Sequence, residues 1–162
     1  MHWTFDPLES KNAHLNLNKL GAVAREYVQD IYGQTDSPLH QGIGTDRFVP
    51  TWTMDSERVV QRLEIGRSGP ETGADDGAVA AFSVVEEGGL LVPGGSDLSI
   101  DASRILTPIP TSIQDLKAES LEAAVRWRQA TRAVLSCYIE RGYEARELYR
   151  RDAHSEYLLV SP

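Results

Sequence analysis

Hydrophobic and polar positions change their spacing along the chain, and these changes predict an alternation of helices and strands. Residues 6–20 have apolar positions at helical spacing, and their first residues, DPLES, are typical of a capped helix N-terminus. Gly21 ends this helix, and residues 22–32 (AVAREYVQDIY) alternate as a strand does. A loop rich in Gly, Pro, Ser and Asp then leads to a second strand, residues 46–54 (DRFVPTWTM), expected to pair antiparallel with the first.

The rest of the chain predicts a hairpin, further strands and one long helix. AVAAFSVV and GLLV flank a glycine pair, which predicts a turn between strands. RILTPIP predicts an edge strand, because proline cannot donate to a strand ladder. Residues 120–141 carry the strongest helical pattern, and YEARELYRR and EYLLV follow as strands. We therefore expect an α+β fold with a mixed, twisted sheet and flanking helices.

A glycine-rich, acidic stretch at residues 66–77 contains almost no apolar positions and predicts a flexible connection. It divides the chain into residues 1–65 and residues 78–162. The two parts echo each other, because LGAVAREYV and RGYEARELY both place Ala-Arg-Glu shortly after a helix-ending glycine. Either an internal duplication or chance explains so short a match.

Composition and charge narrow the classes of partner. The 162 residues carry a formal net charge of −8 and show no basic stripe, so we expect no nucleic-acid partner. No stretch is apolar over the length of a membrane span, and the N-terminus lacks the pattern of a signal peptide. The only cysteine, Cys137, is expected to be structural, and the histidines show no metal-ligand spacing. We expect a cytoplasmic protein without a bound metal or a membrane partner.

The opening helix directs polar side chains toward its apolar side. At 100° per residue, the apolar arc comprises Leu8, Ala13, Leu15 and Leu20. Asn12 and Asn16 fall inside this arc, whereas His14 and Asn18 fall outside it and are expected to face solvent. Because a buried unpaired amide group costs about 1–3 kcal/mol, the two inward asparagines either fasten a neighbouring segment or contact a ligand.

Three arginines are candidate anion contacts. Arg128 and Arg132 lie one turn apart on the apolar face of the long helix, where a guanidinium requires an anionic partner. An internal ion pair with an acidic residue is the favoured explanation, and a grip on a substrate carboxylate or phosphate is the alternative. Arg47, in TDRF after the long loop, is expected to contact a substrate or a structural anion. Asp6 is better explained as a helix cap than as a catalytic base.

The order of elements, together with WTFDPLESKNAHLNLNKLGAVAREY and YGQTDSPLHQGIGTDRFVPTW, resembles the C-terminal arm of the GNAT acyltransferase superfamily. The resemblance continues more weakly through WRQATR, RGYEARELY and YLLV. It implies a GNAT-like fold, acetyl-CoA or another acyl-CoA as co-substrate, and a small-molecule amine as acceptor. It also implies that Asn12 and Asn16, with Lys19 beside them, face the pantetheine arm.

The chain departs from the family pattern in two respects. Leu17 stands where many GNAT enzymes have a tyrosine that protonates the leaving thiolate, so no catalytic residue is assigned. No segment matches the pyrophosphate-binding loop that precedes a helix in the family. We therefore expect residues 1–65 to be the C-terminal arm of a partial GNAT-like domain, with a missing N-terminal half or a homo-oligomer completing it. The alternative is a non-catalytic α+β module for interaction or dimerisation.

Overall fold

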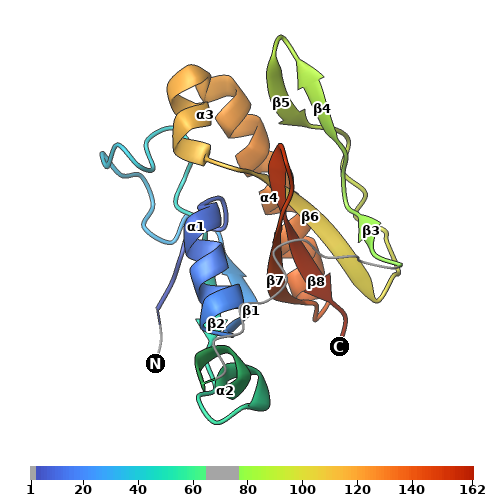
Figure 1. Ribbon diagram of the computed structural model, residues 1–162. Helices are drawn as coiled ribbons and strands as arrows, with labels where there is room; N and C mark the ends of the chain where they lie inside the picture. The colour runs from blue at the N-terminus through green and yellow to red at the C-terminus, as the bar shows by residue number, and fades with distance from the viewer. Residues whose placement is uncertain (1–2, 65–76) are drawn as a thin grey trace.

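The computed structural model describes residues 3–64 and 77–162, which form an α+β fold with a mixed sheet (Figure 1). Most of the glycine-rich connection at 66–77, and with it the predicted mobility, lies outside the described residues. The helices are α1 (Ser10–Ala13), the π-helix η1 (His14–Lys19), α2 (Glu57–Glu64), α3 (Ile113–Glu119) and α4 (Leu121–Glu140). The strands are β1 (Val23–Val28), β2 (Arg47–Thr51), β3 (Val79–Ala80), β4 (Val84–Glu87), β5 (Leu90–Pro93), β6 (Arg104–Pro110), β7 (Glu144–Arg150) and β8 (His154–Val160).

The larger sheet has six strands in the order β2-β1-β7-β8-β6-β3. All neighbouring pairs are antiparallel except β3 with β6. Strands from both sides of the glycine-rich connection therefore share one sheet. The predicted pairing of β1 with β2 is confirmed, and the N-terminal segment adds a single bridge from Phe5 to Phe48. A separate two-stranded hairpin joins β4 to β5 through Gly88 and Gly89, as the glycine pair predicts.

The prediction that RILTPIP is an edge strand is wrong, because β6 lies between β8 and β3. The prolines are tolerated because β3 covers only the start of β6. The carbonyl of Leu106 accepts a hydrogen bond from Ala81, on the β3 side. Pro108 and Pro110 lie two and four residues further on, so their missing N–H groups fall on this same side, past the end of β3.

The two echoing Ala-Arg-Glu segments are neighbours in the sheet. Ala24 of β1 pairs with Ala145 of β7, and the strands are antiparallel. Each strand has a register irregularity at its arginine, Arg25 in the first and Arg146 in the second. Each segment follows a glycine of positive φ at the end of a helix, Gly21 at +73° and Gly142 at +90°. The repeat in the sequence therefore corresponds to two helix–glycine–strand–strand units that meet at one alanine pair.

The opening helix is α-helical only from Ser10 to Ala13 and continues as a π-helix. The amide of Leu20 donates to the carbonyl of Leu15, five residues earlier, at 2.9 Å. A π-helical turn contains more residues, so the rotation per residue falls below 100°. Burial differs accordingly from the prediction: Asn12 and Leu15 are exposed, whereas His14 and Asn18 are buried, the latter completely.

Asn18 supplies hydrogen bonds that a strand would otherwise make. Its Nδ2 donates to the carbonyl of Leu148 at 3.0 Å, and its Oδ1 accepts from the Leu148 amide at 2.9 Å. Since β1 and β7 are bridged only at Ala24 and Ala145 among the described residues, the Asn18 amide takes the place of a peptide group beside β7. It thereby fixes η1 against the sheet.

Ser120 caps the N-terminus of helix α4, because its side chain accepts from the Ala123 amide, and the helix packs against β1, β5 and β6. In Figure 1, α4 passes behind the strands, whereas α1 lies on the viewer's side. The hydrophobic core includes Trp127, Leu135 and Tyr138 of α4. The same buried side of α4 carries Arg128, which brings a charge into the core next to β2 and the N-terminal segment.

We expect Asn18→Ala to lower the free energy of unfolding by about 1–3 kcal/mol for each of the two Leu148 groups left without a partner. Urea denaturation monitored by circular dichroism measures this change. Asn12→Ala, on the exposed side of the same helix, is the matched control and should change the stability by less than about 0.5 kcal/mol. Equal effects of the two substitutions would contradict the role given to Asn18.

Candidate functional site

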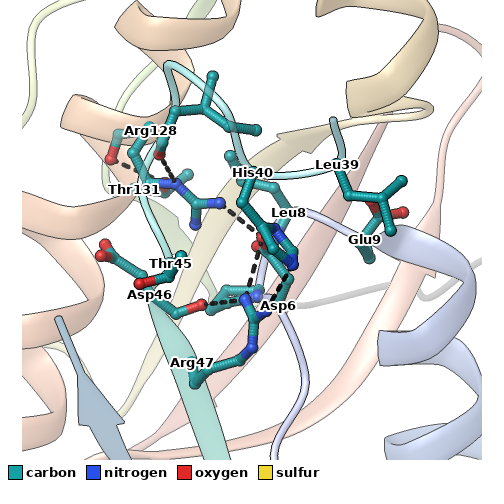
Figure 2. Close-up of polar contacts among 12 residues, drawn as sticks. Asp6, Leu8, Glu9, Leu39, His40, Thr45, Asp46, Arg47, Arg128 and Thr131 are labelled. Carbon is teal, nitrogen blue, oxygen red and sulfur yellow. Dashed lines mark hydrogen bonds and ion pairs between the residues drawn. The ribbon is translucent and has the colours of Figure 1, made fainter. Parts of the chain in front are cut away.

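The carboxylate of Asp6 joins three distant parts of the chain. Its Oδ1 accepts a hydrogen bond from the amide of Leu8 at 2.9 Å, which turns the chain toward α1. Its Oδ2 accepts from Arg128 at 2.7 Å and lies 3.3 Å from Nη1 of Arg47 (Figure 2). All three charged residues are buried, with 6% exposure or less. The prediction that Asp6 caps the helix is wrong, because α1 begins at Ser10 with Glu9 at its N-cap. Asp6 instead shapes the turn before the helix and pairs with two buried arginines, which the sequence pattern did not indicate.

Asp46 is the centre of a second ion-pair cluster. Its carboxylate accepts hydrogen bonds from Nε and Nη2 of Arg132 at 2.8 and 2.6 Å, which is a bidentate pair. The hydroxyl of Tyr27 and the amide of Asp30 also donate to it. The adjacent residues Asp46 and Arg47 thus serve different clusters, as expected for neighbours at a strand, whose side chains alternate.

The internal ion pairs expected for Arg128 and Arg132 are confirmed. Arg128 also donates from Nε to the carbonyl of Ile43 at 2.8 Å, which fastens the loop between β1 and β2 to α4. Its Nη1 has no hydrogen-bond partner among residues 3–64 and 77–162. Arg132 contacts Asp30 at 3.1 Å, at the other end of the same loop. The two arginines therefore act as loop anchors in this structure.

His40 completes the cluster on the Asp6 side as a neutral side chain. Nη2 of Arg47 lies 2.9 Å from Nε2 of His40. Because a guanidinium can only donate, Nε2 must accept and Nδ1 carries the proton. Nδ1 lies 3.9 Å from Oδ2 of Asp6. Burial lowers the pKa of His40, and the neighbouring Arg47 charge lowers it further, so His40 is a poor general base with its lone pair already occupied.

In the cluster around Asp46, hydrogen bonds outweigh the effect of burial and keep the carboxylate charged. Burial alone would raise the pKa of Asp46, but hydrogen bonds from Arg132 and Tyr27 outweigh burial and lower it. Burial raises the pKa of Tyr27 well above its ordinary value, and the Asp46 carboxylate raises it further, so the phenol stays protonated. Asp46 is therefore ionised and Tyr27 neutral near pH 7.

These clusters hold a loop, residues 29–46, that borders an open pocket of about 700 Å³. Thr45 helps to close the loop, because its amide donates to Oδ1 of Asp30 at 3.2 Å and its hydroxyl accepts from the Tyr32 amide at 3.1 Å. Gly44 has φ +78°, and a Cβ there would lie 2.6 Å from Oδ1 of Asp30, so only glycine fits this close approach. The described lining of the pocket is polar and consists of Asp30, Gly33, Gln34, Thr35, Asp36, His40, Gln41, Gly42, Gly44 and Thr45.

The three residues predicted to bind a cofactor lie apart from this pocket. Asn12 is exposed, which corrects the prediction that it points inward, and Lys19 is exposed at the end of η1. Asn16 is buried as predicted, but its amide is used internally. Its Nδ2 donates to the carbonyl of Asn12 at 2.7 Å, and its Oδ1 accepts from the indole of Trp3 at 2.6 Å. Of the two explanations for inward asparagines, the structure favours the fastening of a neighbouring segment for Asn16.

Sequence reasoning missed Tyr27, Asp30, Asp36 and His40 as members of the clusters and the pocket. The long polar loop contains Asp30, Asp36 and His40. Because binding residues often lie in such loops, the composition of the loop was the signal in the sequence that could have identified them. Tyr27 looked like an ordinary strand aromatic. Its partner Asp46 is 19 residues away and only the fold brings the two together.

No family model, curated protein or solved structure matches this chain. In residues 3–64 and 77–162, no helix has the length and apolar character required to span a membrane. Over the same ranges, no group of three or more His, Cys, Asp or Glu side chains is placed to hold a metal ion.

We expect Asp6→Asn to lower the free energy of unfolding by about 3–5 kcal/mol, because the amide retains the contact with Leu8 but leaves two buried arginines without a counter-charge. Urea denaturation at pH 7 measures the loss. The matched control is Glu87→Gln, which breaks the exposed pair of Glu87 with Arg126 and should leave the midpoint nearly unchanged. A mild effect of Asp6→Asn would show that the arginines find other partners.

The lowered pKa of His40 makes stability depend on pH. Below the unfolded pKa of about 6.5, the unfolded chain binds a proton that folded His40 resists, so its contribution to stability is lost as pH falls from about 6.5 toward the folded pKa. His40→Gln can still accept from Arg47 but does not titrate. Between pH 7.5 and pH 5, the urea midpoint should therefore fall further for the wild type than for His40→Gln. Parallel losses in both proteins would contradict this assignment.

Proposed function

We propose that this chain is the acceptor-binding part of a GNAT-type, acyl-CoA-dependent N-acyltransferase, and that the pocket of residues 29–46 holds a small amine. The observation that carries the proposal is the charge of the pocket lining. Asp30 and Asp36 contribute carboxylates, His40 is neutral, and no lysine or arginine belongs to the described lining. A small aliphatic amine is a cation at neutral pH, so this lining attracts it and disfavours anions.

The two carboxylates differ in their availability. Asp30 already contacts Arg132 and the backbone of Thr45. Asp36 is exposed and makes no hydrogen bond or ion pair within the described residues. Asp36 is therefore the residue that we assign to the ammonium group, with Gln34 and Gln41 as neighbouring amides that can accept or donate hydrogen bonds.

Support for the acyltransferase class comes from the order of elements and from the resemblance of the first 54 residues. A helix that ends at Gly21 leads into the antiparallel pair β1 and β2, which is the order that the family arm requires. The co-substrate would be acetyl-CoA or another acyl-CoA. Asn12 and Lys19 are exposed on the opening helix, where a cofactor can reach them. The missing part of the enzyme, or a second copy, would supply the phosphate site.

Amine chemistry in such an enzyme consists of attack by the neutral nitrogen on the thioester carbonyl. The enzyme aligns the two reactants and must accept one proton from the amine. His40 is an unsuitable acceptor, because Arg47 occupies its basic nitrogen. Asp36 holds the ammonium form, so the nitrogen must lose one proton before the attack and a second one from the tetrahedral adduct, while the leaving thiolate takes up one. The acceptors must come from solvent or from residues outside this pocket. Tyr32, 60% exposed at the start of the loop, is the candidate donor to the thiolate.

We expect amines to bind this pocket more tightly than matched neutral compounds. Glucosamine against glucose, and butylamine against butanol, form suitable probe pairs. The measurement is the change of the Gly33, Gly42 and Gly44 amide signals in ¹H–¹⁵N spectra. Asp36→Asn should weaken amine binding about tenfold, which corresponds to one charge-assisted hydrogen bond. Asp101→Asn, an exposed acid outside the pocket, is the matched control.

A thiol-release assay with acetyl-CoA and the amine that binds then separates the two function classes. Acyl transfer by the chain, alone or with the part that completes it, supports the enzyme. Amine binding without any transfer favours the alternative, a non-catalytic α+β module. Equal binding of amines and their neutral analogues would contradict the assignment of the pocket itself.

A further inference from the structure

A second pocket lies at the other end of the β1–β2 pair. The loop pocket follows Val28 and precedes Arg47, which face each other in the register, whereas this one adjoins the opposite pair, Val23 and Thr51. Its volume is about 140 Å³, below the roughly 300–1,000 Å³ typical of pockets for organic ligands. The polar side chains that line it are Arg25, Arg58, Arg146, Thr51, Thr53 and Ser56. In an acidic chain, three arginines and three hydroxyl groups in one small pocket require an explanation.

The arginines are only partly neutralised. Arg25 pairs with Glu144, and Arg58 shares Glu147 with Arg62 at 2.8 and 2.7 Å. The guanidinium of Arg146 makes no hydrogen bond or ion pair within the described residues.

With Arg62, which lies outside the lining, these arginines form a cluster of four that faces two glutamates, so the cluster has an excess of two positive charges. The whole chain carries −8. A local excess of the opposite sign therefore marks this pocket as a place where an anion is favoured.

Irregularities in the sheet position two of these arginines at the pocket. Arg25 and Arg146 each occupy a register irregularity beside the Ala24–Ala145 pair. A bulge interrupts the alternation of side chains and can redirect one of them. Both arginines line the same pocket although they come from different strands. The echoing Ala-Arg-Glu segments thus place one arginine each at the same point of the sheet.

The third arginine is held rigidly. Arg58 donates to the carbonyls of Gly21 and Leu17 at 3.0 Å each, to the carbonyl of Arg146, and to Glu147. Glu147, which is 8% exposed, holds Arg58 in place through their ion pair. These bonds use four of the five N–H donors, so Arg58 offers an anion its positive charge and the remaining N–H of Nη1. Because the guanidinium is already fixed, it loses little conformational entropy when an anion arrives.

We propose that this pocket binds a phosphate group, as inorganic phosphate or as the end of a small phosphomonoester, between Arg25, Arg58 and Arg146. Arginine forks and hydroxyl groups match the several oxygens of phosphate, and the small volume suits a single such group. The hydroxyls of Thr51 and Thr53, both exposed, complete the set of donors. The site is independent of the amine pocket and does not depend on acyl transfer.

The test titrates the whole 162-residue protein with inorganic phosphate at constant ionic strength and follows the amides of Gly21, Val23 and Thr51. We expect saturable binding. Arg146→Gln should weaken it at least about tenfold, and Arg146→Lys should retain part of it. Because Arg146 has no side-chain partner in the described part of the chain, Arg146→Gln should keep the wild-type circular dichroism spectrum. Arg126→Gln, a surface arginine outside the pocket, should bind phosphate as the wild type does.

Phenyl phosphate and acetate distinguish the sources of the anion. Tighter binding of phenyl phosphate than of inorganic phosphate indicates a phosphomonoester ligand, and the reverse indicates free phosphate. Acetate binding as strong as phosphate binding would overturn the assignment to phosphate. Absence of saturation, or an equal loss in Arg146→Gln and Arg126→Gln, would show that only general surface charge attracts the anion and would overturn the site.

Discussion

The shared carboxylate of Asp6 is the constraint on which the candidate amine pocket depends. One oxygen faces both Arg47 and Arg128, and these residues come from the N-terminal segment, from β2 and from α4. Removing buried charges from water is unfavourable, and the ion pair offsets this only when the partners are held in good geometry. Arg128 then holds the carbonyl of Ile43, so the same interaction fixes the loop that forms the pocket. The pocket is therefore a consequence of how the core neutralises its own arginines.

The second organising feature is the meeting of two similar units at Ala24 and Ala145. In each unit a helix ends at a left-handed glycine and leads into an antiparallel strand pair, β1 with β2 and β7 with β8. The units are not equivalent in length, because η1 is a short π-helix and α4 has 20 residues. The Asn18 amide compensates for the single bridge between the units by bonding the backbone of Leu148. A polar side chain thus extends a sheet where backbone pairing stops.

Local patterns in the sequence predicted the local structure well. Alternation identified β1 and β2, the glycine pair identified the β4–β5 turn, and helical spacing identified α4 within a residue at each end. The interior of the opening helix was predicted wrongly, because a fixed 100° rotation from the DPLES segment anticipates neither a helix that begins at Ser10 nor a π-helix from His14. It therefore misplaced Asn12 and Asn18. The prediction that β6 is an edge strand was also wrong. Proline indicates a missing N–H group, but it does not indicate how far a neighbouring strand extends.

The candidate sites show a similar division between what is local and what is not. That Arg128 and Arg132 need acidic partners follows from their position on an apolar helix face. That the partners are Asp6 and Asp46 does not follow, because they lie 122 and 86 residues away and no alternation or spacing links them. In the sequence, Asp6 has a sufficient local explanation as a helix cap, and this explanation conceals its ion pairs with Arg47 and Arg128.

The two pockets at the ends of the β1–β2 pair illustrate why charge has to be assigned by contact and not by count. Arg128 and Arg132 lie close to the loop pocket, and unpaired they would repel a cation there. Asp6, Asp46 and Asp30 together offset Arg47, Arg128 and Arg132, so the carboxylate of Asp36 remains as the unmatched charge of the pocket. At the other end the opposite holds, since Glu144 and Glu147 leave the guanidinium of Arg146 unmatched. Effective charge in each pocket is what remains after internal pairing, and it makes one end of the hairpin suited to a cation and the other to an anion within the same acidic chain.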